Sequence, residues 1–254
     1  MATPQGPTVA FHTLTAYDSH SFLLFGGDGG PSMPIQTLPD SAWSLEITRG
    51  SSVTWDMHSS GWASQPPRRT YHSAAADQDH NVWITGGQKA DGSAIGFQEV
   101  FTFTSQLSTF SQFDTTAGYP PPALVGHGSV ILPTGLLLVF GGYSSSLNTL
   151  VPLSVLFYLD TTSSSPVWGN ITVPGAIPSP RRNFATALLD RNRILIHGGG
   201  DATLQNVYSD GAILDMSLTP ISWVPANGLI EGLGPRVDHT AIGIGSNVFF
   251  MFGQ

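Results

Sequence analysis

Four histidines recur at a fixed place along the chain and are the first residues whose type could support chemistry. They are His12, His72, His127 and His239, and each lies 14 residues before a glycine that ends an apolar run. Imidazole nitrogens bind transition metals, and a ring of them would form a site if they converged within about 2 Å of one ion. The fourth copy has Ala185 at the corresponding place, 13 residues before Gly198. The spacing leaves two interpretations open, a metal ring or a structural residue repeated once per unit.

Two arginine pairs are the next candidates. Arg69, Arg182 and Arg236 lie three residues before the histidine position of their copy, so we assign them to the repeat itself. Arg68 and Arg181 are the extra members of the pairs, in a chain with only nine lysines and arginines. We predict that Arg68 and Arg181 contact an anionic group of a binding partner.

Signatures of catalysis are missing. The sequence has no Gly-x-Ser-x-Gly nucleophile motif, no His-Glu-x-x-His zinc motif and no dinucleotide-binding glycine fingerprint. It has no cysteine, which excludes thiolate metal ligands and cysteine nucleophiles. The acidic residues Asp77 and Asp79 share a short turn pattern, where aspartate commonly bonds the backbone. We expect no catalytic residue, no bound metal and no cofactor.

Composition narrows the class of protein further. Apolar residues make up 41% of the chain and charged residues 10%, which supplies a core and argues against disorder. The net charge of −8 does not suit a nucleic-acid backbone, so we expect no nucleic-acid partner. No apolar run is long enough to cross a bilayer, so this segment should not insert into a membrane. The 29 glycines and 19 prolines lie between short apolar runs, as in a protein of short strands and many turns.

The elements that must position these residues are five copies of one phrase, an apolar strand followed by a glycine pair. The first glycines are 60, 55, 57 and 55 residues apart, and a period near 50 residues is typical of propeller repeats. No segment carries a helical apolar stripe with caps, so the fold class is all-β. The complete pairs are Gly26 and Gly27, Gly86 and Gly87, Gly141 and Gly142, and Gly198 and Gly199, and the last copy reads Gly253-Gln254.

Each copy supplies the strands of one four-stranded antiparallel blade. We expect a single domain over residues 1–254, with blades near 8–57, 68–113, 123–172 and 182–225 and an incomplete one at 236–254. The glycine pairs fit places where blades crowd, or where a positive φ is needed. The tryptophans of the outer strands, Trp55, Trp168 and Trp223, should pack between blades as apolar wedges.

Arg-x-x-His, a strand pair ending in Gly-Gly, and a later Trp-containing strand together resemble the kelch repeat over the whole chain. Leu24-Phe25-Gly26-Gly27-Asp28 and Tyr208-Ser209-Asp210-Gly211 are similar to fungal "galactose-oxidase-like" kelch proteins, several of which resemble cell-surface ectodomains. The resemblance implies a β-propeller in which the repeated histidine satisfies backbone groups of neighbouring loops. Galactose oxidase chemistry needs a tyrosine cross-linked to cysteine, so that activity is not expected here.

Long loops on one face of the propeller are the expected binding surface. They follow the glycine pairs, as at 28–41, 88–98, 143–154 and 200–210, and they join successive blades. With Arg68 and Arg181, the candidate contacts are Tyr143, Asp201 and Tyr208. We expect a non-catalytic scaffold for a protein or glycan partner; the alternatives are a propeller enzyme or metal-dependent specifier with a polar site at the channel mouth, or a structural remnant of a truncated gene.

Compartment and assembly are less constrained. The Asn170-Ile171-Thr172 sequon and the fungal likeness favour an extracellular or cell-surface fragment, and a cytoplasmic location stays open. The half blade at the end predicts open terminal blades with apolar faces, through which the chain could self-associate.

Overall fold

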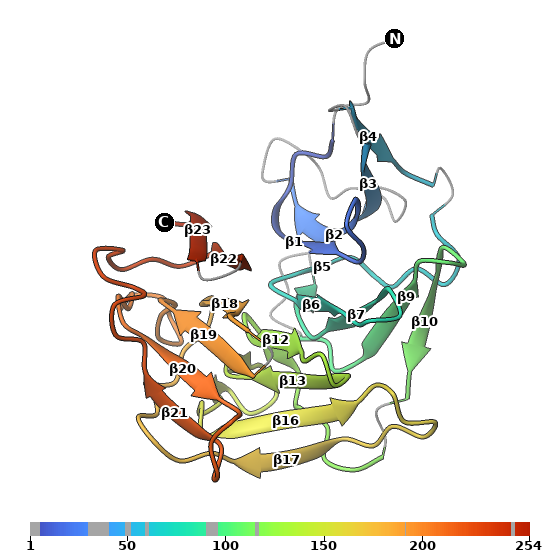
Figure 1. Cartoon of the computed structure of the whole chain (residues 1–254). Coiled ribbons are helices and arrows are strands. Elements are labelled where there is room, and N and C mark those ends of the chain that lie inside the picture. The colour runs from blue at the N-terminus through green and yellow to red at the C-terminus, as the bar shows by residue number, and fades with distance from the viewer. Residues whose placement is uncertain are drawn as a thin grey trace. The chain divides into compact units, whose positions relative to one another are not determined.

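A computed structural model describes residues 6–29, 41–48, 52–58, 61–89, 96–114, 117–190, 192–244 and 247–254. The regular elements in these ranges are strands, paired antiparallel, which confirms the all-β class (Figure 1). No helix in these ranges has the length and apolarity to cross a membrane. The chain divides into an N-terminal unit, Met1–Asp114, and a C-terminal unit, Thr115–Gln254, and each is described by itself.

The N-terminal unit holds two four-stranded sheets, here called blades 1 and 2. Blade 1 has the order β1-β2-β3-β4, and blade 2 has the order β10-β9-β7-β6, beside a short pair of β5 and β8. The strands are β1 (Ala10–Ala16), β2 (Ser21–Asp28), β3 (Ala42–Thr48), β4 (Ser52–Asp56), β5 (Arg69–Thr70), β6 (Ser73–Ala76), β7 (Asn81–Thr85), β8 (Gln88–Lys89), β9 (Val100–Thr104) and β10 (Thr109–Phe113).

The C-terminal unit holds blades 3 and 4, a hairpin that we call blade 5, and a small sheet of β11, β14 and β15. Blades 3 and 4 have the orders β12-β13-β16-β17 and β18-β19-β20-β21, and blade 5 is β22-β23. The strands are β11 (Leu124–Val125), β12 (Gly128–Ile131), β13 (Leu136–Phe140), β14 (Tyr143–Ser144), β15 (Thr149–Leu150), β16 (Val155–Asp160), β17 (Gly169–Thr172), β18 (Ala185–Leu188), β19 (Arg193–His197), β20 (Gly211–Asp215), β21 (Ser222–Pro225), β22 (His239–Ile244) and β23 (Asn247–Phe252).

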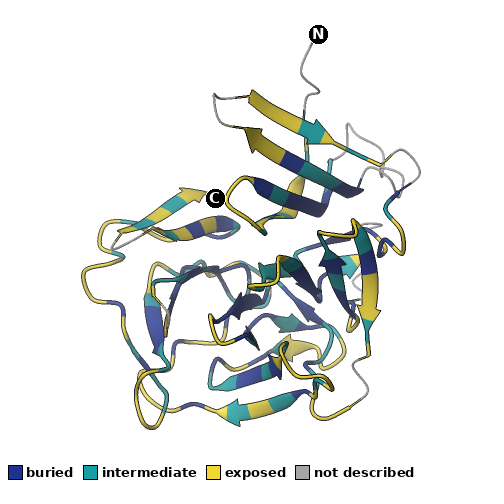
Figure 2. Ribbon diagram, turned by 45° about the vertical axis from the view of Figure 1, so that its right-hand side comes forward, coloured by how far each residue is buried: buried dark blue, intermediate teal, exposed yellow. Residues whose placement is uncertain are grey.

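Burial follows the sheet order within each blade. The second strands β7, β13 and β19 lie between two partners and are buried along nearly their whole length, as the dark ribbon of Figure 2 shows. Such strands read as continuous apolar runs because both faces are covered. In the C-terminal unit, β12 packs against β18 and β18 against β22, so the first strands of neighbouring blades gather together.

The outer-strand tryptophans are packed to different degrees. Trp168 and Trp223 are both 1% exposed, and the Trp223 indole Nε1 donates to the carbonyl oxygen of Leu153 at 2.8 Å. Phe140 packs edge-on to Trp223, with ring centroids 6.2 Å apart. Trp55 in blade 1 is half-buried, with Gly6 beside its indole ring.

Candidate interaction face

One residue per blade adopts a left-handed backbone at the entry to the first strand. In the C-terminal unit these residues are Gly126, Asn183 and Asp238, with φ of 65°, 58° and 57°. The Asn183 amide donates to the carbonyl oxygen of Gly126 at 2.8 Å, and the Asp238 amide donates to that of Asn183 at 3.1 Å. In the N-terminal unit the equivalent residues are Phe11 and Tyr71, joined by the same backbone hydrogen bond at 3.2 Å. These residues step from one blade to the next and position the loops around them.

This backbone pattern corrects the predicted register of blade 4. The residue after Asn183 is Phe184, and its Cβ lies 2.8 Å from an ideal Cβ on Gly199. His127 approaches Gly142 in the same way at 2.6 Å. Phe184, not Ala185, therefore occupies the histidine position.

The same correction moves the repeat arginine of blade 4. Arg181 lies 17 residues before Gly198, as Arg69 lies 17 residues before Gly86. Arg181 is therefore the repeat arginine and Arg182 the extra one, the reverse of the sequence-based assignment.

The ring at the histidine position packs on the preceding blade. His72 lies against Phe25 with ring centroids 5.3 Å apart, and His239 lies against His197 at 5.1 Å. Phe184 and Phe140 lie at the equivalent places with ring centroids 6.0 Å apart, but they are stacked rather than edge-on. His12 is exposed. Among the described residues no three His, Cys, Asp or Glu side chains are placed to hold a metal ion.

The repeat arginines are buried inside their blades. Arg69 and Arg181 are both 0% exposed, and their Nη1 atoms donate to the carbonyl oxygens of Gly86 at 3.1 Å and Gly198 at 2.9 Å. Arg69 lies 4.0 Å from the ring centroid of Phe97, and desolvation lowers its pKa to about 10.

Arg181 is fully engaged within its own blade. It lies 4.6 Å from the ring centroid of Tyr208 and forms a two-pronged pair with Asp210, at 2.8 and 2.9 Å. A buried guanidinium that already holds a carboxylate has no room for a second anion. Arg181 is therefore occupied within its own blade in this structure, and its contact with a partner's anion stays a prediction.

Arg68 and Asp201 also form hydrogen bonds within the chain. Arg68 is 9% exposed, and its Nε donates to the carbonyl oxygen of Gly27 at 2.5 Å, so it is not the solvated anion contact that we expected. The Asp201 carboxylate accepts the amides of Thr203, Gln205 and Asn206, and hydrogen bonds to Asn206 and Thr203 lower its pKa. Asp201 therefore organises its own loop.

We define the loop face as five described side chains on connecting segments of the C-terminal unit: Tyr143, Arg182, Tyr208, Asp210 and Asp238. The Arg182 guanidinium carbon lies 5.8 Å from the Tyr143 ring centroid, and the Arg182 Nε atom is buried without a hydrogen bond to any described residue. The Asp210 side chain is 58% exposed. Asp238 accepts from Asn183 Nδ2 at 2.7 Å, and burial raises its pKa.

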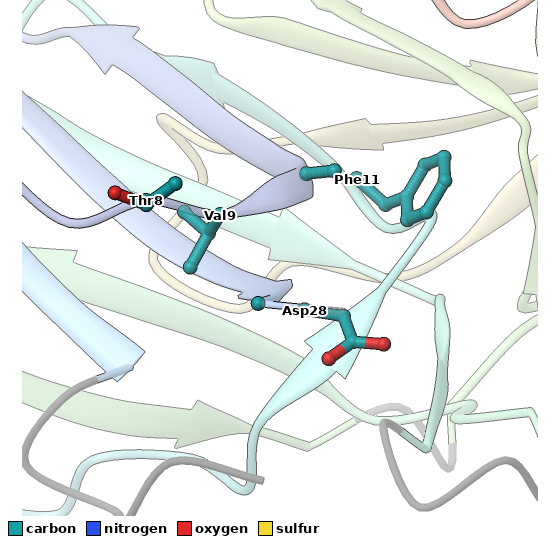
Figure 3. A pocket seen from close by; sticks show the side chains of 6 residues that line it. Thr8, Val9, Phe11 and Asp28 are labelled. Carbon is teal, nitrogen blue, oxygen red and sulfur yellow. The ribbon is translucent and has the colours of Figure 1, made fainter. Parts of the chain in front are cut away.

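A shallow pocket lies in the N-terminal unit. Its volume is about 260 Å³, and Figure 3 shows Thr8, Val9, Phe11 and Asp28 at its wall. Phe11 stacks on Tyr71 beside it, with ring centroids 4.4 Å apart. Asp28 is the sole ionisable side chain among the six lining residues, so the pocket lacks the paired groups of an acid-base site.

Comparison with known proteins identifies the same kind of repeat along the chain. The profile described as the KLHDC2/KLHL20/DRC7 Kelch-repeats domain matches residues 9–253. The chain belongs to the kelch-repeat family. Domains of this family act in general as protein-interaction scaffolds.

Similar kelch-repeat relatives are much longer proteins. The chain is 31% identical over 254 residues to acyl-CoA-binding domain-containing protein 5 of Arabidopsis thaliana, covering 98% of the chain and 36% of that protein. It is 23% identical over 248 residues to Adagio protein 3 of the same plant, covering 95% and 38%. A third match, 28% over 193 residues, covers 75% of the chain and 4% of the Dynein alpha chain, flagellar outer arm, of Chlamydomonas reinhardtii. The chain therefore spans well under half the length of each of these relatives.

The loop face overlaps in part with the binding residues expected from the sequence. Tyr143 and Tyr208 belong to both sets, whereas Arg182, Asp210 and Asp238 were not among the expected residues; a binding role for any of the five stays a prediction. Asn and Asp tolerate the left-handed backbone better than most residues, which was an available signal for Asn183 and Asp238. Asp210 precedes β20 directly, and its pairing with Arg181 depends on a loop path that composition does not reveal.

Proposed function

We propose that this kelch-repeat domain is a non-catalytic scaffold that binds a protein partner through the loop face of its C-terminal unit. The observation that carries the proposal is the grouping of two aromatic rings, one guanidinium and two carboxylates on adjacent loops. Tyr143 and Tyr208 present rings with polar tips, and such side chains dominate protein-binding surfaces. Arg182 and Asp210 add charges of both signs, which favour a polar peptide segment over an apolar small molecule.

Rigid support makes the loop face a suitable platform. Arg181 lies behind Tyr208 and Asp210 and fixes both by a cation–π contact and a two-pronged ion pair. Asp201 holds the preceding loop by accepting three of its amides. A loop that is ordered before binding loses less conformational freedom when a partner docks.

Affinity enrichment with the purified chain tests the proposal. The bait variants are the chain itself, the loop-face variant Tyr143→Ala with Arg182→Ala, and the control Arg193→Gln, whose exposed arginine begins β19 at the end away from His197. We expect proteins enriched on the chain and on the control to be lost at least tenfold on the loop-face variant. Equal enrichment on all three baits, with all three folded by circular dichroism, would remove this surface from consideration.

Three narrower expectations from the sequence remain hypotheses: a glycan partner, a propeller enzyme, and an extracellular placement with a fungal likeness. A glycan partner would give enrichment that glycosidase treatment of the lysate abolishes. A propeller enzyme would require converging acid and base groups, and at the blade entries Asp238 is paired with the amide of Asn183 instead. Asn170 is exposed on β17, so glycan mass on this residue in natively produced protein would support the extracellular placement and the fungal likeness.

A further inference from the structure

The connection between blades 4 and 5 contains the only asparagine of the chain that is followed by glycine, Asn227-Gly228. This pair comes just after the outer strand β21 of blade 4, and both residues are exposed. They form the centre of a turn, because the Leu229 amide donates to the carbonyl oxygen of Ala226 at 3.2 Å. The turn is thus closed at its ends, while its two central residues face solvent.

An asparagine before a glycine can react with its own main chain. The glycine nitrogen loses its proton to solvent and bonds Cγ of the asparagine, which closes a five-membered succinimide ring. The bond from Cγ to the side-chain nitrogen breaks, and that nitrogen leaves as ammonia. Water then opens the ring at either carbonyl group, giving aspartate or an isoaspartyl residue whose main chain runs through the side-chain carbon. The reaction consumes one water and needs no enzyme.

The surroundings of Asn227 favour this ring closure. No residue that the structure describes hydrogen-bonds the Gly228 amide or the Asn227 side chain, so both reacting groups are available. Gly228 has a φ of 77°, and a Cβ built on it would meet nothing within 4 Å. Glycine also changes its backbone angles at little steric cost. The attacking nitrogen therefore has both the freedom and the space to approach Cγ.

Three other exposed asparagines of the C-terminal unit lack these features and serve as controls within the same molecule. Each is followed by a β-branched residue, whose stiff side chain crowds the attacking nitrogen. Each of those residues is also paired, in β15, in β17 or in a bridge to Gly200, which fixes the main chain. The three controls are Asn148-Thr149, Asn170-Ile171 and Asn206-Val207.

We propose that Asn227 is a site of spontaneous deamidation, at which the folded domain is converted with time to aspartyl and isoaspartyl forms. Either product adds one negative charge to a chain whose net charge is −8. The isoaspartyl product also adds a carbon atom to the main chain between Ala226 and Ile230, which both pack in the apolar cluster with Leu195 and Ile213. The longer connection cannot keep both contacts and the turn between them, so the turn loosens. This inference does not depend on the proposed binding of a partner.

Timed incubation of the full chain at physiological temperature tests the proposal. Proteolysis and mass spectrometry follow conversion at each asparagine, and methylation by an isoaspartate methyltransferase detects the isoaspartyl form. We expect conversion at Asn227 to be at least tenfold faster than at the three controls, and faster in mildly alkaline than in neutral buffer, because the attacking nitrogen must lose a proton. Asn227→Gln should abolish the signal, and Gly228→Ala should slow it at least tenfold.

A synthetic peptide Val-Pro-Ala-Asn-Gly-Leu-Ile-Glu, which copies residues 224–231, shows how fast the reaction runs without the fold. If the folded chain stays unconverted while half of the peptide reacts, the proposal is overturned, because the turn then protects the asparagine. Equal conversion at the controls would overturn it as well.

Hydrogen exchange tests the effect on the turn. The Leu229 amide should exchange faster in the isoaspartyl form, separated by ion exchange, and as before in Asn227→Asp, which adds the charge without the extra carbon. Exchange that is unchanged in both would contradict the loosening.

Discussion

His197 and His239 are hydrogen-bonded to each other in the interior of the C-terminal unit, with Nδ1 of His197 2.9 Å from Nε2 of His239. One ring nitrogen donates and the other accepts, so the bond requires that the pair not be doubly protonated. Burial lowers the pKa of both rings. The pKa of His239 falls to about 4, because desolvation has the largest effect and the positive charges of His197 and Arg236 lower it further. His127 has a pKa of about 4 for the same first reason.

The stability of the chain should therefore fall in mild acid. A histidine with a native pKa near 4 and an unfolded pKa near 6.5 binds fewer protons when folded than when unfolded across that interval. Stability is then greatest above pH 6.5 and declines toward pH 4, by at most about 1.4 kcal/mol per pH unit for each such histidine. Urea unfolding at several pH values between these limits measures the slope.

A double variant isolates the contribution of the pair. Blade 3 has Phe140 and blade 4 has Phe184 where His197 and His239 lie, so His197→Phe with His239→Phe reproduces a ring pair that the fold already accepts. We expect a shallower slope, and His127 contributes to the slope that remains. His20→Gln, an exposed site, serves as the control, and an unchanged slope in the double variant would contradict the assignment.

Two ion pairs among the described residues of the C-terminal unit should contribute very different amounts to the free energy of unfolding. Asp210→Asn leaves the fully buried Arg181 guanidinium without its counter-charge, which should lower the free energy of unfolding by about 2 kcal/mol or more. Asp190→Asn breaks a pair whose side chains are 48% and 44% exposed, and should cost less than about 1 kcal/mol. Chemical denaturation of both variants near pH 7 compares them, and equal losses would refute the structural role of Arg181.

The position of Arg181 also shows which features of the fold the sequence predicted and which it did not. The glycine pairs and alternating strands predicted the four-stranded blades, because a repeated apolar period is a direct consequence of burial on the sheet faces. The predicted alignment of the repeat in blade 4 was wrong by one residue, because Phe184 replaces the histidine and the prediction placed Ala185 at that position. That single step exchanged the roles of Arg181 and Arg182, although one is enclosed and the other lies on the loop face.

Loop residues were harder to predict than strand residues for a physical reason. Tyr143 and Tyr208 were selected by chemistry, but Asp201 bonds its own loop amides, which a turn-forming sequence does not distinguish from a partner contact. Most of the predicted loop at 28–41, namely residues 30–40, and residues 90–95 of the one at 88–98 lie outside the described residues.

Asn183 should tolerate glycine better than alanine. Its φ of 58° strains any residue with a Cβ, and the neighbouring blade has Gly126 at the same place with φ of 65°. Both substitutions remove the hydrogen bond to Asp238, so the difference in stability between the two variants measures the backbone strain alone. We expect Asn183→Gly to be more stable than Asn183→Ala by about 1 kcal/mol in thermal unfolding, and the opposite order would show that the left-handed backbone is not maintained.

Gly175 should be far less tolerant of alanine than Gly228, although both have positive φ, of 106° and 77°. A Cβ on Gly175 would lie 2.2 Å from the carbonyl oxygen of Trp223, while one on Gly228 would meet nothing within 4 Å. The Gly175 segment cannot move away easily, because Pro174 accepts from the Trp223 amide at 2.9 Å and Ala176 donates to the Trp223 carbonyl at 2.8 Å.

These two hydrogen bonds attach the connection between blades 3 and 4 to the outer strand of blade 4. Left-handed strain is common to both alanine variants and costs roughly 1 to 2 kcal/mol, so the clash accounts for any difference between them. We expect Gly175→Ala to lose at least about 2 kcal/mol more than Gly228→Ala in urea unfolding. Since the Trp223 indole also bonds Leu153, tryptophan fluorescence should shift in the first variant alone, and a matched response from the two variants would mean that this connection does not fix the blade.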